Sequence, residues 1–150
     1  MNRLVVDPNR AERVADIAKA ILAWAAAQAS VQGLALIGSH ARGEARPDSD
    51  IDFLALALDP EAFAADSAWL GAIAWPGMRL VNWQDERYGL VWSRRLWLEP
   101  ACEVELSFGP PSWAALNPVD AGTRKVVLDG FGILYDPDGL MKRLYDECRR

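Results

Sequence analysis

The sequence predicts a mixed α/β (α+β) domain in which helices flank one central mixed sheet. Three observations lead to this prediction. Apolar residues recur at helical spacing near the N-terminus, and short apolar runs bounded by turn residues follow, as is typical of buried strands. No internal repeat or Gly/Ser-rich linker divides the 150 residues. This length suits a single domain spanning residues 1–150.

The first expected element is a helix from Asn9 to Ala29. Its apolar residues recur every three or four positions, and charged residues take the opposite face. The apolar stripe consists of Val14, Ile17, Ala18, Ile21, Leu22 and Ala25. Gly33 is expected to end this helix, because glycine is a common stop signal.

Two short strands are expected next, one on each side of a polar turn. The first is the apolar run from Leu34 to Ile37, which ends at Gly38-Ser39. A continuous apolar run is typical of a strand buried on both faces. The second strand runs from Ile51 to Leu58. Asp59-Pro60 then opens a helix that extends to about Ala74, because proline is tolerated in a first turn.

The second half of the chain is predicted to be mostly strands. The segment from Met78 to Phe108 is rich in Trp, Val, Leu and Tyr, which predicts two to four strands with a turn near Glu99-Pro100. A short strand is expected from Phe131 to Tyr135, followed by a final helix that ends near Arg149. Helices that interrupt strands in this way favour one central sheet.

Composition restricts the classes of function. The chain has 16 Lys and Arg against 21 Asp and Glu, a net charge of −5. No nucleic-acid partner is expected, since general affinity needs clustered cations, whereas a cationic partner is compatible with this charge. The uncharged stretch from Ala20 to Ala41 holds too many polar residues for a membrane span. Cys102 and Cys148 suggest no disulfide framework, so we expect a cytoplasmic protein.

The most informative feature is a pair of acids at the start of the second strand. Asp50 and Asp52 are two residues apart, so both carboxylates leave the same face, while Ile51 and Phe53 face the core. Two carboxylates this close repel one another unless a cation lies between them. Mg²⁺ accepts such oxygen ligands and usually keeps substrate phosphates as further ligands.

A second feature lies at the end of the preceding strand. Gly38 allows the backbone to approach a ligand closely, and Ser39 adds a hydroxyl that could cap a short helix or hold a phosphate oxygen. A bare Gly-Ser is usually a turn, and a bare Asp-x-Asp is usually solvated surface. Together, in this order and each beside an apolar strand, they indicate phosphoryl or nucleotidyl transfer.

The run GSHARGEARPDSDIDFLAL resembles the signature of the DNA polymerase β-like nucleotidyltransferase superfamily. It is especially similar to the minimal and the aminoglycoside nucleotidyltransferases. The shared pattern is an apolar residue, Gly-Ser, a spacer of about ten residues, and Asp-x-Asp inside an apolar strand. The resemblance implies the nucleotidyltransferase fold.

The resemblance also implies a third carboxylate on an adjacent strand. From Cys102 to Phe108, apolar residues take one face, and Glu103 and Glu105 share the other. The segment from Glu105 to Gly109 is similar to the one around the third acid in streptomycin-type adenylyltransferases. We therefore place the third acid at Glu105, with Glu103 as the alternative. A glutamate in this position would act more as a general base than as a firm metal ligand.

By the same resemblance, the Gly38-Ser39 turn would hold the β- and γ-phosphates of the nucleotide. Ser49 would contact the nucleotide or order the loop. Arg42 would pair with the triphosphate, or brace the loop against Glu44 or Asp48, since Arg–acid pairs are common at surfaces.

Three further residues have structural interpretations. His40 is the only histidine, so neither a His-based metal cluster nor a Ser-His-Asp triad can form, and its side chain is expected to be exposed. Arg124 or Lys125 would reach a phosphate or lie in a solvated loop, and we favour the loop.

The function implied is transfer of a nucleoside monophosphate, with ATP as the expected substrate, to an acceptor hydroxyl. Asp50 and Asp52, completed by Glu105, would hold Mg²⁺, expected as two ions, and Glu105 would help to deprotonate the acceptor. The metal ligands are thus Asp50, Asp52 and Glu105, and the nucleotide-binding residues are Gly38, Ser39, Arg42 and Ser49.

The acceptor is left open between a small hydroxylated molecule, such as an aminoglycoside, and a partner protein. The second alternative follows from short members that resemble antitoxins, which AMPylate a helical toxin. A third is a non-catalytic nucleotide-binding module. The acceptor pocket would come from the domain's own surface, from a second copy in a homodimer, or from a partner. Trp83, Trp92 and Trp97 are expected in the core or on a sheet face, or else lining an acceptor or adenine pocket.

Overall fold

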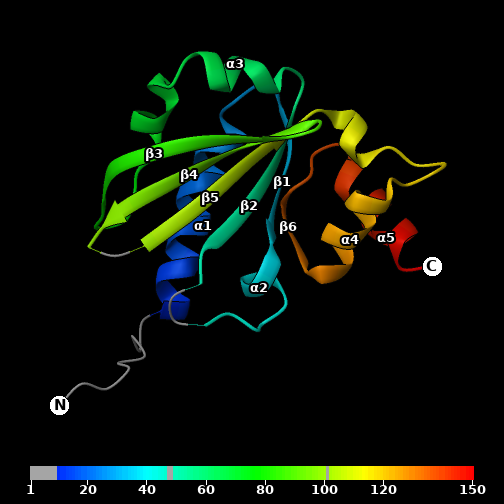
Figure 1. Ribbon diagram of the computed structural model, residues 1–150, viewed down its shortest axis with the longest axis horizontal. Coiled ribbons are helices and arrows are strands. Elements are labelled where there is room, and N and C mark those ends of the chain that lie inside the picture. The colour runs from blue at the N-terminus through cyan, green and yellow to red at the C-terminus, as the bar shows by residue number, and fades with distance from the viewer. Residues whose placement is uncertain (1–9, 47–48, 101) are drawn as a thin grey trace.

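A computed structural model describes residues 10–46, 49–100 and 102–150. It is a mixed α/β fold built on one six-stranded sheet with the strand order β3-β4-β5-β2-β1-β6 (Figure 1). The strands are β1 (Val31–Ile37), β2 (Ile51–Ala57), β3 (Arg79–Tyr88), β4 (Val91–Glu99), β5 (Cys102–Gly109) and β6 (Phe131–Tyr135). The helices are α1 (Arg10–Ala26), α2 (Gly38–Ala41), α3 (Pro60–Ala65), α4 (Ala121–Asp129) and α5 (Leu140–Cys148), with 3₁₀ turns η1 (Ala68–Ala72) and η2 (Pro111–Ala114).

The sheet is mixed because β2 and β5 run parallel at its centre, while the other neighbouring strands pair antiparallel. In this parallel pair, Asp52 lies opposite Glu105 and Phe53 opposite Leu106. Because side chains alternate between the two faces of a strand, this register places two acids on one face and two core residues on the other.

One face of the sheet is covered by α1, α3 and η1, which enclose the larger core. Apolar residues of β2, β4 and β5 pack there against Ile17, Ile21 and Trp24 of α1. The aromatic centre of this core is a stack in which Phe108 lies between Trp92 and Phe63, with ring centroids 4.8 and 5.0 Å away. The inward-facing residues of β4 and β5 belong to this core, apart from the buried Arg94.

The other face is covered only over part of its width, by η2, α4 and α5. A smaller core joins Ala35 and Leu56 to residues of these helices, among them Met141 and Leu144. Strands β3, β4 and most of β5 lie outside this second layer, as Figure 1 shows with α4 and α5 gathered on the β6 side. The part of this face formed by β3, β4 and most of β5 is thus not covered by helices.

Two boundaries differ from the sequence prediction. The first helix ends at Ala26, and Gly33 lies inside β1 rather than ending the helix. A Cβ at Gly33 would be 3.1 Å from the Met141 side chain, so this glycine makes room for α5 to pack on the sheet. The helix expected from Asp59 to about Ala74 is split into α3 and η1, because the Asp66 carboxylate accepts a hydrogen bond from the Ala68 amide and turns the chain.

The prediction that Arg124 and Lys125 lie in a solvated loop is wrong, because both residues are in α4. Asp120 is its N-cap and accepts a hydrogen bond from the Thr123 amide at 3.1 Å. Arg124 donates to the Cys148 carbonyl, and Lys125 pairs with Asp129. Within the described ranges, no helix is long and apolar enough to cross a bilayer.

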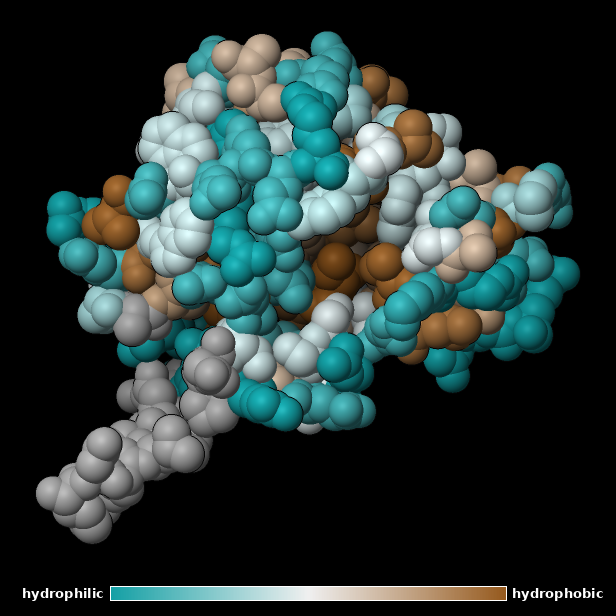
Figure 2. Space-filling view, viewed as in Figure 1, coloured by the Kyte–Doolittle hydropathy of each residue, from teal (hydrophilic) through white to brown (hydrophobic). Residues whose placement is uncertain are grey.

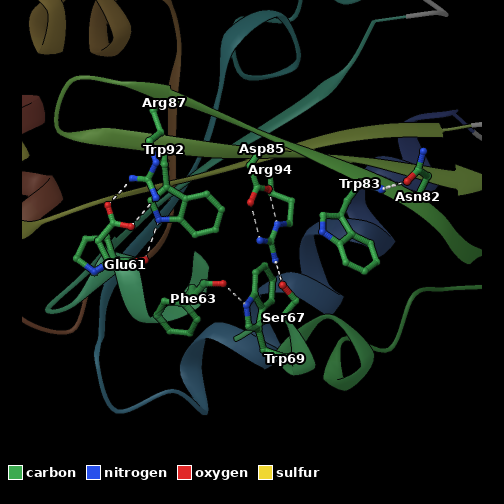
Figure 3. A network of polar contacts seen from close by, with 11 residues as sticks. Glu61, Phe63, Ser67, Trp69, Asn82, Trp83, Asp85, Arg87, Trp92 and Arg94 are labelled. Carbon is green, nitrogen blue, oxygen red and sulfur yellow. Dashed lines mark hydrogen bonds and ion pairs between the residues drawn. The ribbon is translucent and has the colours of Figure 1, made fainter. Parts of the chain in front are cut away.

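A buried arginine ties the edge of the sheet to the α3–η1 segment. Arg94 of β4 is 1% exposed and forks onto the Asp85 carboxylate of β3, with N–O distances of 2.6 and 2.8 Å. It also donates to the Ser67 hydroxyl at 2.9 Å. The rings of Trp69, Trp83 and Trp92 surround its guanidinium group (Figure 3). These contacts satisfy a charge that burial would otherwise make costly.

Arg94→Ala is expected to lower the free energy of unfolding by about 3 kcal/mol, because it leaves a cavity and breaks the fork to Asp85. Arg79→Ala is the matched control. It removes only an exposed ion pair with Glu99 and should cost less than about 1 kcal/mol. Urea unfolding followed by circular dichroism measures both values. Equal losses in the two variants would show that Arg94 does not join these elements.

Candidate active site

Two carboxyl groups meet on the open face of the sheet. Asp52 of β2 and Glu105 of β5 are register partners, so their side chains leave the same face of neighbouring strands. Ile51 and Phe53, the neighbours of Asp52, are fully buried in the core on the other face. The apolar alternation of both strands therefore holds the two acids together.

The environment favours the protonated form of Asp52. Burial, followed by the charges of Glu105 and Asp50, raises the pKa of Asp52 to about 7. Burial likewise raises the pKa of Glu105. Oδ1 of Asp52 is buried and has no hydrogen-bond partner among the described residues. A bound proton or cation would therefore stabilise this pair of carboxyl groups.

The Gly38-Ser39 turn lies directly beside this pair. Ile37, the last residue of β1, is the register partner of Asp52, and Gly38 then turns the chain with φ of +75°. A Cβ at Gly38 would be 2.8 Å from Oδ2 of Asp52, so a larger residue would displace this carboxylate, and the positive φ also favours glycine. Gly130, after α4, approaches the other side of the turn, where a Cβ would be 2.8 Å from the Gly38 carbonyl oxygen. Sequence reasoning missed Gly130.

Asp50, the first acid of the motif, pairs with an arginine that the sequence analysis did not single out. Nη1 of Arg95 in β4 lies 3.4 Å from Oδ2 of Asp50 and 3.5 Å from Oε2 of Glu103. Arg95 is also the register partner of Glu105. The predicted turn at Glu99-Pro100 pairs residues of the two strands whose numbers add to 200, and Arg95 and Glu105 are such a pair. The sequence therefore contained a signal that could have identified Arg95.

The loop between α2 and β2 contains the remaining expected residues. The Ser49 hydroxyl accepts a hydrogen bond from the Arg46 amide at 2.8 Å, and its carbonyl accepts one from Arg10 at 2.7 Å. Arg42 pairs with Glu44 at 3.6 Å and donates to the Asp129 carbonyl at 3.3 Å. These contacts correspond to the loop-ordering alternatives for Ser49 and Arg42.

Other parts of the loop differ from expectation or lie beyond description. Asp48, the other acid weighed as a partner of Arg42, lies outside the described residues. His40 is half-buried rather than exposed, and its Nε2 is buried without a hydrogen-bond partner in the described ranges. Burial lowers the pKa of His40.

The three tryptophans weighed as a pocket do not form one cluster. Trp92 is buried in the larger core, and Trp83 pairs with Leu96, a residue of the same core face. Trp97 pairs with Glu103 and thus shares the face of the acids. The alternation of β4 separates Trp92 from Trp97, because residues five apart on a strand face opposite sides.

The carboxylates of this site are potential ligands for a divalent cation. In the described parts of the chain, no three His, Cys, Asp or Glu side chains form a group ready to hold a metal, and Asp50 is paired with Arg95 instead. The residues nevertheless fit Mg²⁺. The buried Oδ1 of Asp52 lacks a partner, Glu105 adjoins it, and carboxylate oxygens are the ligands that Mg²⁺ prefers.

A cleft of about 620 Å³ begins at Glu105 and extends between the open part of the sheet and the η2–α4 segment. Tyr88, Leu90 and Trp113 are among its walls. Ser93 and Ser107, whose hydroxyls are 2.7 Å apart, also line it. Figure 2 shows a hollow with hydrophobic residues at its base on this side of the molecule. Such a volume is typical of small-molecule sites.

The fold and this arrangement define a class of nucleotide-transferring domain, and comparison with known proteins agrees. The nucleotidyltransferase domain family matches residues 17–110. The chain therefore belongs to the nucleotidyltransferase domain family, as the Gly-Ser and Asp-x-Asp motifs predicted, and this membership supports nucleotidyl transfer as the general reaction. The comparison with curated proteins found no match.

Among solved structures, an aminoglycoside 6-adenyltransferase from Bacillus subtilis is similar, with a TM-score of 0.52 and 16% sequence identity. The similarity covers 67% of this chain and 36% of that enzyme. This chain thus spans about a third of the enzyme's length. At this identity the likeness concerns the fold, and it confirms the predicted nucleotidyltransferase fold.

Asp52→Asn is expected to change how stability depends on pH in metal-free buffer. The folded-state pKa of about 7 lies above the ordinary 3.8, so Asp52 stabilises the fold fully below pH 4 and loses that contribution as the pH rises through 7. Asparagine does not titrate, so the free energy of unfolding of the variant does not fall for this reason. At pH 8 the variant should therefore be more stable than the wild type by on the order of 2–4 kcal/mol.

Urea unfolding in EDTA at intervals from pH 4 to pH 8 measures this difference, which should nearly vanish at pH 4. A residual slope is expected in the variant, because Glu105 also has a raised pKa. If both proteins gave parallel profiles, Asp52 would not titrate in this range.

Gly38→Ala and Gly43→Ala separate backbone strain from contact with Asp52. The two glycines have nearly the same φ, +75° and +74°, but a Cβ at Gly43 meets nothing within 4 Å. Gly43→Ala should cost about 1 kcal/mol of stability from strain alone. Gly38→Ala should cost about 2–3 kcal/mol, because the methyl group also displaces the Asp52 carboxylate. Urea unfolding decides, and equal costs would exclude the close approach.

Proposed function

We propose that this domain is a Mg²⁺-dependent enzyme that transfers AMP from ATP to a hydroxyl group of a small acceptor. The observation that carries the proposal is the pairing of Asp52 with Glu105 on neighbouring parallel strands, directly beside the Gly38-Ser39 turn. A phosphate-binding turn next to paired carboxylates supports nucleotidyl transfer more strongly than either feature does alone.

Asp50, Asp52 and Glu105 would hold the cation, and its charge would neutralise the α-phosphate when bound. The Gly38-Ser39 turn would bind the β- and γ-phosphates, because it lies against Asp52. Arg42, at the end of α2, braces this turn through its contacts with Glu44 and Asp129. These roles require no rearrangement of the sheet.

Glu105 would accept the proton of the acceptor hydroxyl. Burial raises the pKa of Glu105, which strengthens its carboxylate as a base. As the O–H bond breaks, the acceptor oxygen forms a bond to the α-phosphorus, and the bond from that phosphorus to the bridging oxygen breaks. Pyrophosphate leaves with the bonding electron pair, so atoms and charges balance.

The cleft supports a small acceptor. It adjoins Glu105, and none of its described lining residues is Lys or Arg, whereas Glu105 and Asp120 are acidic. The walls therefore suit a neutral or cationic hydroxylated molecule with an apolar part better than an anionic one. Its placement at Glu105 would bring an acceptor hydroxyl to the proposed base.

The test is transfer of label from α-labelled ATP in the presence of Mg²⁺ with a panel of aminocyclitols and aminoglycosides, and separately with cell lysate. Label on a small molecule supports the proposal. Label on one protein band would instead support an AMPylating antitoxin, and ATP binding without any transfer would indicate a non-catalytic module.

Glu105→Gln is expected to lower the transfer rate by about 10²–10⁴-fold, because it removes the base while keeping the size of the side chain. Glu103→Gln is the control on the same strand face and should stay within about fivefold of the wild type. Asp50→Asn and Asp52→Asn should abolish transfer. If Glu103→Gln were the more damaging of the two glutamine variants, Glu103 would be the third acid.

A further inference from the structure

Arg95 occupies a central position among the acids of the candidate site. It projects from β4 onto the open face, pairs with Asp50 and Glu103, and lies across the strand pair from Glu105. Burial alone would lower its pKa, but the charges of Asp50, Glu105, Glu103 and Glu86 outweigh burial and raise it. An arginine stays charged at every accessible pH, so this site always contains one fixed positive charge.

The Asp50 carboxylate has two competing partners, Arg95 and the proposed metal ion. Asp50 is one of the proposed metal ligands, yet its Oδ2 is 3.4 Å from Nη1 of Arg95. A divalent cation on Asp50 would repel the guanidinium group and compete with it for the carboxylate. Side chains of Arg95 and Asp50 are both about one-third exposed, so the pair can separate without leaving a buried charge.

We propose that Arg95 is a positioning residue that acts as a built-in counter-cation: it holds Asp50 in the metal-free protein and releases it when a divalent cation binds. This inference rests on the proposed function, because the cation is the metal of that site. Arg95 thereby stabilises the metal-free fold and lowers the affinity for metal in the absence of nucleotide.

Glu103 has a defined part in this exchange. It is 3.5 Å from the same Nη1 atom of Arg95 and lies two residues before Glu105 on the same face of β5. After Asp50 is released, Glu103 retains the guanidinium group. The weighed alternative for the third acid thus becomes the anchor of Arg95.

The experiment measures binding of Mn²⁺ alone, from the spectrum of free Mn²⁺ in electron paramagnetic resonance. Arg95→Gln should bind Mn²⁺ about tenfold more tightly than the wild type, because one repelling charge is removed and Asp50 is freed. Arg95→Lys keeps the charge without the guanidinium group and should lie between them. Arg79→Gln, which removes an exposed arginine of the same sheet, should equal the wild type.

Thermal unfolding supplies a second readout. In EDTA at pH 8, Arg95→Gln should unfold at a lower temperature than the wild type, because the four acids around Arg95 then lack their counter-cation. Saturating Mn²⁺ should raise its unfolding temperature by more than it raises that of the wild type. Arg95→Lys supplies the same comparison if the glutamine variant does not fold.

A double-mutant cycle tests the part of Glu103. Glu103→Gln should weaken Mn²⁺ binding by a few fold, because Arg95 is left with Asp50. In the Arg95→Gln background, Glu103→Gln should have no further effect. A further loss there would make Glu103 a metal ligand and overturn its role as anchor.

The outcomes separate the two proposals. If the wild type binds Mn²⁺ and Arg95→Gln binds it equally or more weakly, the counter-cation role is overturned and the proposed function stands. If neither protein binds Mn²⁺ or gains stability from it, the metal site of the proposed function fails, and the exchange at Arg95 falls with it.

Discussion

The parallel pairing of β2 with β5 is the constraint on which the rest of the structure depends. Its register sets Asp52 opposite Glu105, and the same hydrogen bonds set Phe53 opposite Leu106 in the core. A shift of one residue would place the acids in the core and the apolar side chains in solvent. Stability of the core and geometry of the site are therefore specified together.

The two faces of the sheet have opposite uses. One is covered by α1, α3 and η1, and even its single buried cation, among the described residues, is enclosed by a carboxylate and three indole rings. The other is covered only on the β1–β6 side, where η2, α4 and α5 pack. The uncovered part forms the cleft and leaves the acids partly accessible, so incomplete layering makes room for the candidate site.

Most strands and the first and last helices followed from periodicity, since alternating and helical patterns report directly on burial. The sequence-based prediction was wrong at α4, which was expected to be a loop, and at Gly33, which was expected to end the first helix. In both places tertiary contacts determine the local structure. Asp120 caps a helix whose packing on α5 was invisible in the chain, and Gly33 stays in a strand because Met141 needs the space. Trp92 lies in the core as expected, whereas the alternative of one tryptophan pocket could not be judged from the sequence, because the registers of β3, β4 and β5 were unknown.

The sequence by itself determined the family and placed the Gly38-Ser39 turn and the acids Asp50 and Asp52 beside apolar strands, because those patterns can be read locally. The same strand pattern fits Glu103 and Glu105 equally, so the choice of Glu105 came from the resemblance and stays a prediction. Only the tertiary structure decided how these groups share charge. The raised pKa of Asp52 and the pairing of Arg95 with Asp50 arise from burial and from neighbours on other strands. Such energies depend on distances across the sheet, which are set when the strands assemble.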